Sequence, residues 1–305
     1  MIAAANALAI GCASAPQTAE PCALNFTNAA ELVGRDTLST PFADVRLTIS
    51  PNGRRELWGT NARTGGPGSY DIWERRRIGA TWSAPHPVSF DSEYKEFDPF
   101  FAADGSGVYY FSNRPGGVGG DDLYFSALNA KGEYEPGVNL GRGVNSAGNE
   151  WGPSVSPDGS RLLFASDGLG GRGKHDLVVA TRRTDGSWGP AAPIPGEING
   201  PLDEFDATYL DDGRTIVFAR EEIVGTDTSS ALMVSFFARG GYSRPVKLSS
   251  AVNLDGVWDF GTATSVAVPG VLFFTSHRPD SVGRSDLYRI GYRLRATGCR
   301  LPGTI

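Results

Sequence analysis

The chain has 305 residues, of which 40 are Gly and 20 are Pro. These two residue types make up about a fifth of the chain against roughly an eighth in an average protein, which excludes an architecture of long helices. An apolar content of 40% excludes disorder by composition. The net charge is −6 and no cluster of Lys or Arg is long enough to follow a phosphate backbone, which argues against nucleic acid as the main partner.

Residues 1–21 are predicted to form an export signal or lipoprotein-like tail and a linker. Met1 to Gly11 is apolar and small, and the run Leu8-Ala9-Ile10-Gly11-Cys12 resembles a bacterial lipobox, in which the Cys carries lipid. No basic residue precedes the apolar run, as a signal peptide requires, so an uncleaved tail is the alternative. Polar residues from Gln17 onward leave the run too short to span a bilayer, so a lipid on Cys12 is the only membrane attachment we expect.

The other two cysteines lie near the two ends of the remaining chain. Cys22 and Cys299 are predicted to form a disulfide that joins these ends, with two free buried thiols as the alternative. A disulfide favours an oxidising compartment, so we expect a periplasmic or outer-membrane-tethered protein of the bacterial envelope.

A repeat of about 54 residues begins with a tight turn followed by a short β-rich run. The turns are Ser50-Pro51-Asn52-Gly53, Ala103-Asp104-Gly105, Ser156-Pro157-Asp158-Gly159, Asp211-Asp212-Gly213 and Pro269-Gly270. An Asn-Gly or Asp-Gly pair between two strand-like runs predicts a β-hairpin, because the turn needs positive φ.

Each unit continues with a glycine-rich loop that leads into a third strand, and an Asp precedes the apolar pair of that strand in four of the five units: Asp71, Asp122, Asp176 and Asp286. These side chains are predicted to cap the loop backbone. A fourth, outer strand has the form W-S-x-P, as at Trp82 to Pro85. Four strands per unit therefore repeat in order.

The last unit lacks its outer strand, and the segment Leu24 to Gly34 supplies an unmatched one. Residues 22–305 are therefore predicted to form a single all-β domain, a five-bladed β-propeller with four-stranded blades and a seam blade shared by the N- and C-termini. Ring closure removes exposed sheet edges. The motifs S-P-D-G, F-A-S, G-G-x-G-G-x-D-L-Y and W-S-x-P resemble the WD-like repeats of TolB-type bacterial propellers over about residues 24–296, and this resemblance implies the fold rather than an activity.

Aligning the units places an acid at the start of every innermost strand: Asp44, Glu96, Glu150, Glu204 and Asp259. The next residue is bulky, Val45, Phe97, Trp151, Phe205 or Phe260, and the one after it varies as Arg46, Asp98, Gly152, Asp206 and Gly261. Because innermost strands line the channel, these side chains are expected near one mouth. The acids either bind calcium or a polar ligand there, or stabilise the ring through hydrogen bonds.

Residues that break the fivefold pattern are the stronger functional candidates. They are Arg46, Asp98, Asp206, Glu221-Glu222 and His277-Arg278. The predicted ligand-binding set is Asp44, Arg46, Glu96, Asp98, Glu150, Trp151, Glu204, Asp206, Asp259, His277 and Arg278.

The sequence contains no G-x-S-x-G, H-E-x-x-H or Walker motif. We therefore expect a monomeric, non-catalytic envelope binding or scaffold protein, without a cofactor other than calcium, that engages a protein, peptide or glycan at the channel mouth. A glycan-directed hydrolase is the alternative, with Asp98, Glu150, Glu204 and Asp206 as candidate catalytic acids.

Overall fold

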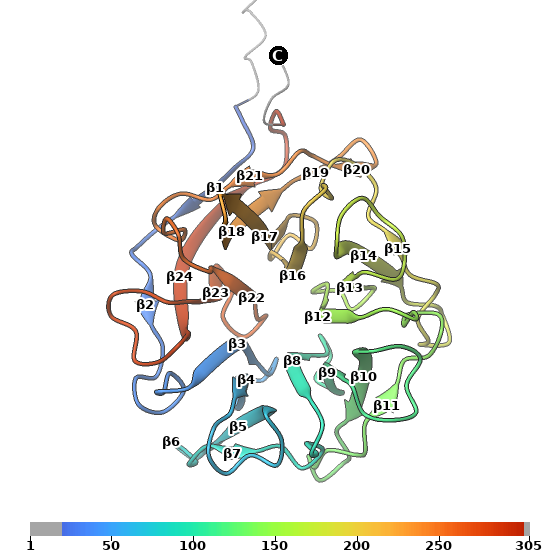
Figure 1. Cartoon of the computed structure of the whole chain (residues 1–305), viewed down its shortest axis with the longest axis vertical. Coiled ribbons are helices and arrows are strands. Elements are labelled where there is room, and N and C mark those ends of the chain that lie inside the picture. The colour runs from blue at the N-terminus through green and yellow to red at the C-terminus, as the bar shows by residue number, and fades with distance from the viewer. Residues whose placement is uncertain (1–19, 302–305) are drawn as a thin grey trace, which may run out of the picture.

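A computed structural model describes residues 20–301, which form strands arranged as five sheets around a central axis (Figure 1). The all-β fold, the five blades and the four-stranded blade are as predicted from the repeats. No helix long and apolar enough to cross a membrane occurs in residues 20–301. The tail proposed for lipidation, with Cys12, lies outside the described residues.

The first three blades follow one another along the chain. Blade 1 comprises β3 (Ala43–Ile49), β4 (Arg55–Asn61), β5 (Tyr70–Ile78), β6 (Thr81–Trp82) and β7 (His86–Pro87), the last two both pairing with β5. Blade 2 comprises β8 (Glu96–Phe101), β9 (Gly107–Ser112), β10 (Asp122–Ala127) and β11 (Val138–Asn139). Blade 3 comprises β12 (Glu150–Val155), β13 (Arg161–Ser166), β14 (Asp176–Thr181) and β15 (Ala192–Pro193).

The last two blades depart from the simple pattern. Blade 4 comprises β16 (Glu204–Tyr209), β17 (Ile216–Val224), β18 (Asp227–Ser235) and β21 (Val246–Lys247), with a small hairpin of β19 (Phe237–Ala238) and β20 (Gly241–Tyr242). The seam blade comprises β22 (Phe260–Ala263), β23 (Val271–Ser276) and β24 (Asp286–Arg295), to which β1 (Ala23–Phe26) and β2 (Glu31–Leu32) add as outer strands.

The closure of the ring between the two chain ends is as predicted. β1 pairs antiparallel with β24 from Ala23 opposite Arg295 to Phe26 opposite Tyr292, and the blue N-terminal and red C-terminal segments lie side by side in Figure 1. Cys22 and Cys299 form a disulfide with their Cα atoms 4.9 Å apart. The bond therefore joins the two ends of the described chain beside the seam blade that they build together.

Repeated turns and loops also follow the sequence prediction. The turn glycines between the first and second strands all have positive φ, from 63° to 74°: Gly53, Gly105, Gly159, Gly213 and Gly270. The loop aspartates accept backbone N–H groups of their own loops, as in the bonds of 2.8 and 2.9 Å from Arg172 and Gly173 to Asp176. These side chains hold the glycine-rich loops in place and are not available to a ligand.

Each blade buries one large aromatic side chain of its second strand in an apolar cluster that it shares with a neighbouring blade. Trp58, Tyr110, Phe164, Phe218 and Phe274 are at most 1% exposed. A second repeated contact was not apparent from the sequence. It is made by an Asn in the connection between blades, whose side chain hydrogen-bonds to both the N–H and the C=O of one residue in the preceding third strand. Asn199, for example, accepts from Leu177 N and donates to Leu177 O, both at 2.9 Å, and Asn145 and Asn253 do the same one blade earlier and later.

Candidate functional site

The five acids at the start of the innermost strands are fully buried, and they face the connections between blades rather than the channel. Each carboxylate accepts a backbone N–H from that connection over 2.7–3.0 Å, from Thr40, Ser92, Ser146, Gly200 and Leu254 respectively. Burial raises the pKa of Asp44, Glu150, Glu204 and Asp259, and these hydrogen bonds oppose the rise. The expected placement of this column at the channel mouth is thus not found, because the side chains turn into their own loops.

Arginines complete this arrangement in four of the five blades. Arg114 Nη2 lies 2.8 Å from Glu96, Arg220 Nε lies 2.8 Å from Glu204, and Arg63 Nη1 lies 3.9 Å from Asp44. Arg278 interacts electrostatically with Asp259, while its guanidinium lies 5.0 Å from the ring centre of Phe274. Arg278 therefore belongs to this repeated contact, and its neighbour His277 is exposed.

The position two residues after each acid is where the innermost strand bulges. Arg46, Asp98, Gly152, Asp206 and Gly261 all have positive φ, from 49° to 60°, and the strand register shifts at this point in every blade. Gly adopts this conformation freely, whereas other residues pay of order 1–3 kcal/mol. Three blades nevertheless carry Arg or Asp there, which makes the bulge the place where backbone strain and charge coincide.

Arg46 closes the channel. Its side chain is fully buried and extends from blade 1 across the axis, where Nη2 donates to Pro153 O at 2.9 Å and to Ala207 O at 3.4 Å, and Nη1 lies 3.2 Å from Asp206 Oδ1. The opposite mouth, at the ends of the innermost strands, retains a cavity of only about 30 Å³. The space above Arg46 is therefore a blind pocket rather than a pore.

Asp98 and Asp206 form the floor of that pocket. Each is 5% exposed, and the two carboxyl groups hydrogen-bond to one another. Asp206 also accepts Gly261 N at 2.9 Å and faces Arg46. Burial and then the charge of Asp206 raise the pKa of Asp98 well above its ordinary value. Burial also raises the pKa of Asp206, and the Arg46 guanidinium opposes that rise.

The wall above this floor is mostly aromatic and encloses about 250 Å³. We call this space the cup. Its lining includes the bulky residue that follows the acid in every blade, together with the floor and four further residues: Val45, Phe97, Trp151, Phe205, Phe260, Asp98, Asp206, Tyr70, Lys95, Phe111 and Asp121.

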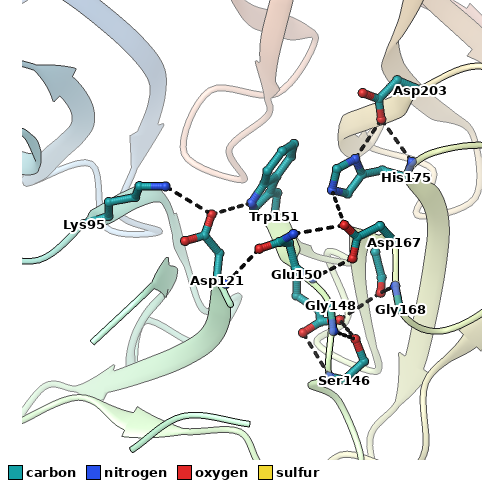
Figure 2. A network of polar contacts seen from close by, with 12 residues as sticks. Lys95, Asp121, Ser146, Gly148, Glu150, Trp151, Asp167, Gly168, His175 and Asp203 are labelled. Atoms are coloured by element: carbon teal, nitrogen blue, oxygen red, sulfur yellow. Dashed lines mark hydrogen bonds and ion pairs between the residues drawn. The ribbon is translucent and has the colours of Figure 1, made fainter. Parts of the chain in front are cut away.

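A polar network holds the wall and rim, as Figure 2 shows. Asp121 accepts the indole N–H of Trp151 at 2.8 Å and lies 3.5 Å from Lys95 Nζ. Behind Trp151, the His175 ring stacks on the indole at 3.9 Å between centres, and its Nδ1 lies 2.9 Å from Asp203 Oδ1. Contacts at its N–H edge and on one face therefore fix the orientation of the Trp151 indole.

Of the predicted ligand-binding residues, the structure brings only Asp98, Trp151 and Asp206 to the cup, with Arg46 below them. Glu150 and Glu204 lie in the buried connections instead. The sequence analysis missed Tyr70, Lys95, Phe111 and Asp121. One signal was present, because the position just before each acid reads Ala43, Lys95, Asn149, Asp203 and Trp258, which varies far more than the acid itself.

No group of three or more His, Cys, Asp or Glu side chains within residues 20–301 is arranged to hold a metal ion. Each acid of the repeated column faces a different loop, so the five carboxylates do not converge on a common point. Calcium binding by this column remains a prediction from the sequence.

No protein-family model matches the sequence, and no curated protein matches it. Solved structures do match. Arabinanase Arb43A of Bacillus subtilis aligns with a TM-score of 0.52 and 11% identity over 81% of this chain and 94% of its own. The chain is similar to it in fold. TolB from Acinetobacter baumannii aligns with a TM-score of 0.47 and 12% identity over 84% of this chain, which spans 56% of that TolB.

A putative TolB from Agrobacterium tumefaciens aligns with a TM-score of 0.42 and 17% identity over 83% of this chain and 91% of its own. TolB proteins and glycoside hydrolases both stand among the structural neighbours. At these identities the comparisons show the propeller fold and do not choose between the two functions.

Proposed function

We propose that this chain is a non-catalytic binding or scaffold protein of the cell envelope, which engages a protein, peptide or glycan through the cup. The observation that carries the proposal is the blind aromatic pocket on the propeller axis, with a buried acid pair on its floor. Ligand sites are typically concave and mostly apolar, with a few converging polar groups, and the cup has this composition.

Backbone strain supports a ligand role for the floor. Arg46, Asp98 and Asp206 adopt positive φ where Gly152 and Gly261 serve the same bulge in the other two blades without strain. A purely structural bulge has no need of charged side chains, since Gly would meet the backbone requirement in all five blades. Residues that keep a strained backbone despite this cost are concentrated at functional sites.

The disulfide supports the envelope location. The Cys22–Cys299 bond joins the ends of the fold, and such bonds persist in oxidising compartments and are rare in the bacterial cytosol. The proposed lipid anchor at Cys12 adds to this location but falls outside the described residues, and mass spectrometry of the exported protein tests it directly.

Ligand-dependent thermal stabilisation of the full chain tests the binding role. Peptides, peptidoglycan fragments and oligosaccharides, each with calcium or with chelator, are screened for a rise in melting temperature, because a ligand of the native state must raise it. The Trp151→Leu variant is expected to lose the shift. Trp82→Leu is the matched control, since Trp82 lies on the outer strand β6 beside Arg75, away from the cup.

A glycan-directed hydrolase is the second candidate. It is favoured by the acid pair, because burial raises the pKa of both carboxyl groups and a raised pKa suits a general acid. The direct hydrogen bond opposes it, because the two carboxyl groups of glycosidases stand about 5 Å or more apart. Release of reducing sugar from oligosaccharides that is lost in Asp206→Asn but kept in Trp82→Leu would establish the hydrolase and overturn the non-catalytic role.

A further inference from the structure

We propose that the cup takes an alkylammonium group, such as a lysine side chain presented by a peptide, with the aromatic wall around the cation and Asp98 as its counter-charge. The inference rests on the binding function proposed above and names the chemical class of its ligand. It follows from the composition of the wall, from the pairing of the charges at the floor and rim, and from the shape of the pocket.

The wall is a cage of rings supplied by several blades. Tyr70 meets Phe97 edge to face with ring centres 5.1 Å apart, and Trp151 is fixed by its bond to Asp121 and by the stack on His175. Phe205 and Phe260 continue the ring of side chains. Aromatic faces attract cations, with Trp the strongest, and recognition of ammonium groups by surrounding rings is a recurrent use of this attraction.

The charges around the cup are paired with one exception. Asp206 is matched by Arg46, and Asp121 at the rim is matched by Lys95. Asp98 is the remaining carboxyl of the lining, and Asp206 and the backbone of Gly152 act on it. Asp98 is 5% exposed, and Arg46, the cation that lowers its pKa, forms its salt bridge with Asp206 instead. The side chain that faces the pocket without its own counter-ion is thus an acid.

A cation that enters the cup supplies the counter-charge that Asp98 lacks. Without it, burial and the neighbouring Asp206 raise the pKa of Asp98, which favours the protonated carboxyl. An ammonium group above the floor favours the ionised form, so its binding expels that proton to solvent. The other titratable or charged groups that face this point are Arg46, Asp206, Lys95 and Asp121, and each already has a partner.

Other ligand classes fit the same surface less well. An anion would meet two acids at the floor, and the nearest cation at the rim is engaged by Asp121. A sugar ring presents many hydroxyl groups, whereas five of the eleven lining side chains carry no hydrogen-bonding atom. Of the charged groups in the lining, Lys95, Asp121 and Asp206 are already paired. A narrow alkyl chain that ends in a cation matches a mostly aromatic wall above an acidic floor.

Titration of the full chain with n-butylammonium chloride, Nα-acetyl-lysine amide and the uncharged 1-pentanol tests this inference, followed by tryptophan fluorescence and calorimetry. The ammonium probes are expected to bind about tenfold or more tightly than 1-pentanol. Their affinity should rise up to tenfold per pH unit below the pKa of Asp98, with proton release visible as a dependence of the binding enthalpy on the buffer.

Variants distinguish a failure of the ammonium inference from a failure of the proposed binding function. Asp98→Asn is expected to abolish the preference for ammonium and the proton release while 1-pentanol still binds. Glu222→Gln, which changes a half-buried acid paired with Lys247 outside the lining of the cup, should alter neither the preference nor the proton release. Equal affinity for charged and uncharged probes, or an unchanged preference in Asp98→Asn, overturns the ammonium inference. If neutral glycans or peptides bind and Trp151→Leu removes that binding, the binding function stands without it. If no probe depends on Trp151, both proposals fail.

Discussion

Replacement of Arg46 by Met tests whether this buried cation holds the channel closed. Arg46 is fully buried and makes three contacts across the axis, to Asp206, Pro153 O and Ala207 O. Removing one partner of a buried ion pair costs about 3–5 kcal/mol of unfolding free energy, because the other charge is left unpaired. At about 2–4 °C per kcal/mol for a domain of roughly this size, the melting temperature should fall by roughly 6–20 °C.

Equilibrium urea unfolding at pH 7, followed by tryptophan fluorescence, measures this loss. Arg289→Met is the matched control, since Arg289 and Glu31 form a pair of similar length, 2.9 Å, whose side chains are 56% and 53% exposed, and such pairs contribute about 0–1 kcal/mol. The double variant Arg46→Met/Asp206→Asn should recover most of the loss because no charge is left unpaired. Equal losses in Arg46→Met and Arg289→Met would refute the reasoning.

Three further predictions concern the floor, the closure and the blade contacts. Asp98→Asn should melt at a higher temperature than the parent at pH 7 and at the same temperature near pH 3.5. Because the folded-state pKa of Asp98 is raised, the contribution of this carboxyl to the free energy of unfolding is full below about pH 3.8 and is lost as pH rises through the folded pKa. Asn does not titrate, so the variant does not show this loss. An Asp98→Asn variant less stable than the parent at pH 7 would contradict this. Replacing Cys22 and Cys299 together by Ser should cost roughly 2–5 kcal/mol in denaturant unfolding, since the bond closes a loop with a sequence separation of 277, and a reducing agent should act on the parent alone. Asn199→Ala should cost about 1–3 kcal/mol, because two buried backbone groups of Leu177 lose their partner; hydrogen exchange at Leu177 that stays as slow as in the parent would count against this contact.

The architecture of this protein was readable from its sequence because local signals repeat. The Asn-Gly and Asp-Gly turns need positive φ wherever they occur, so four of them in register, with Pro269-Gly270 as the fifth turn, predict five hairpins. The unmatched strand near the N-terminus and the two terminal cysteines independently predicted the closure that β1, β24 and the disulfide make. Such features depend on short-range backbone chemistry and on counting units, both of which the linear sequence contains.

The site was readable only in part. Aligning the units identified the acidic, bulky and variable columns, but not the direction in which each side chain points. The bulge at Arg46, Asp98 and Asp206 breaks the alternation of the innermost strand, so the acids turn into buried connections while the next two columns form the wall and floor of the cup.

Tertiary structure alone decided which residues meet at the axis. Asp98 and Asp206 lie in blades 2 and 4, and Arg46 reaches them from blade 1, so their contact depends on the closed ring and on no spacing along the chain. The hydrogen bond from Trp151 of blade 3 to Asp121, which pairs with Lys95 in blade 2, likewise joins side chains from different blades. Their shared burial is what raises the pKa of Asp98, and burial is a property of the folded ring rather than of any one segment.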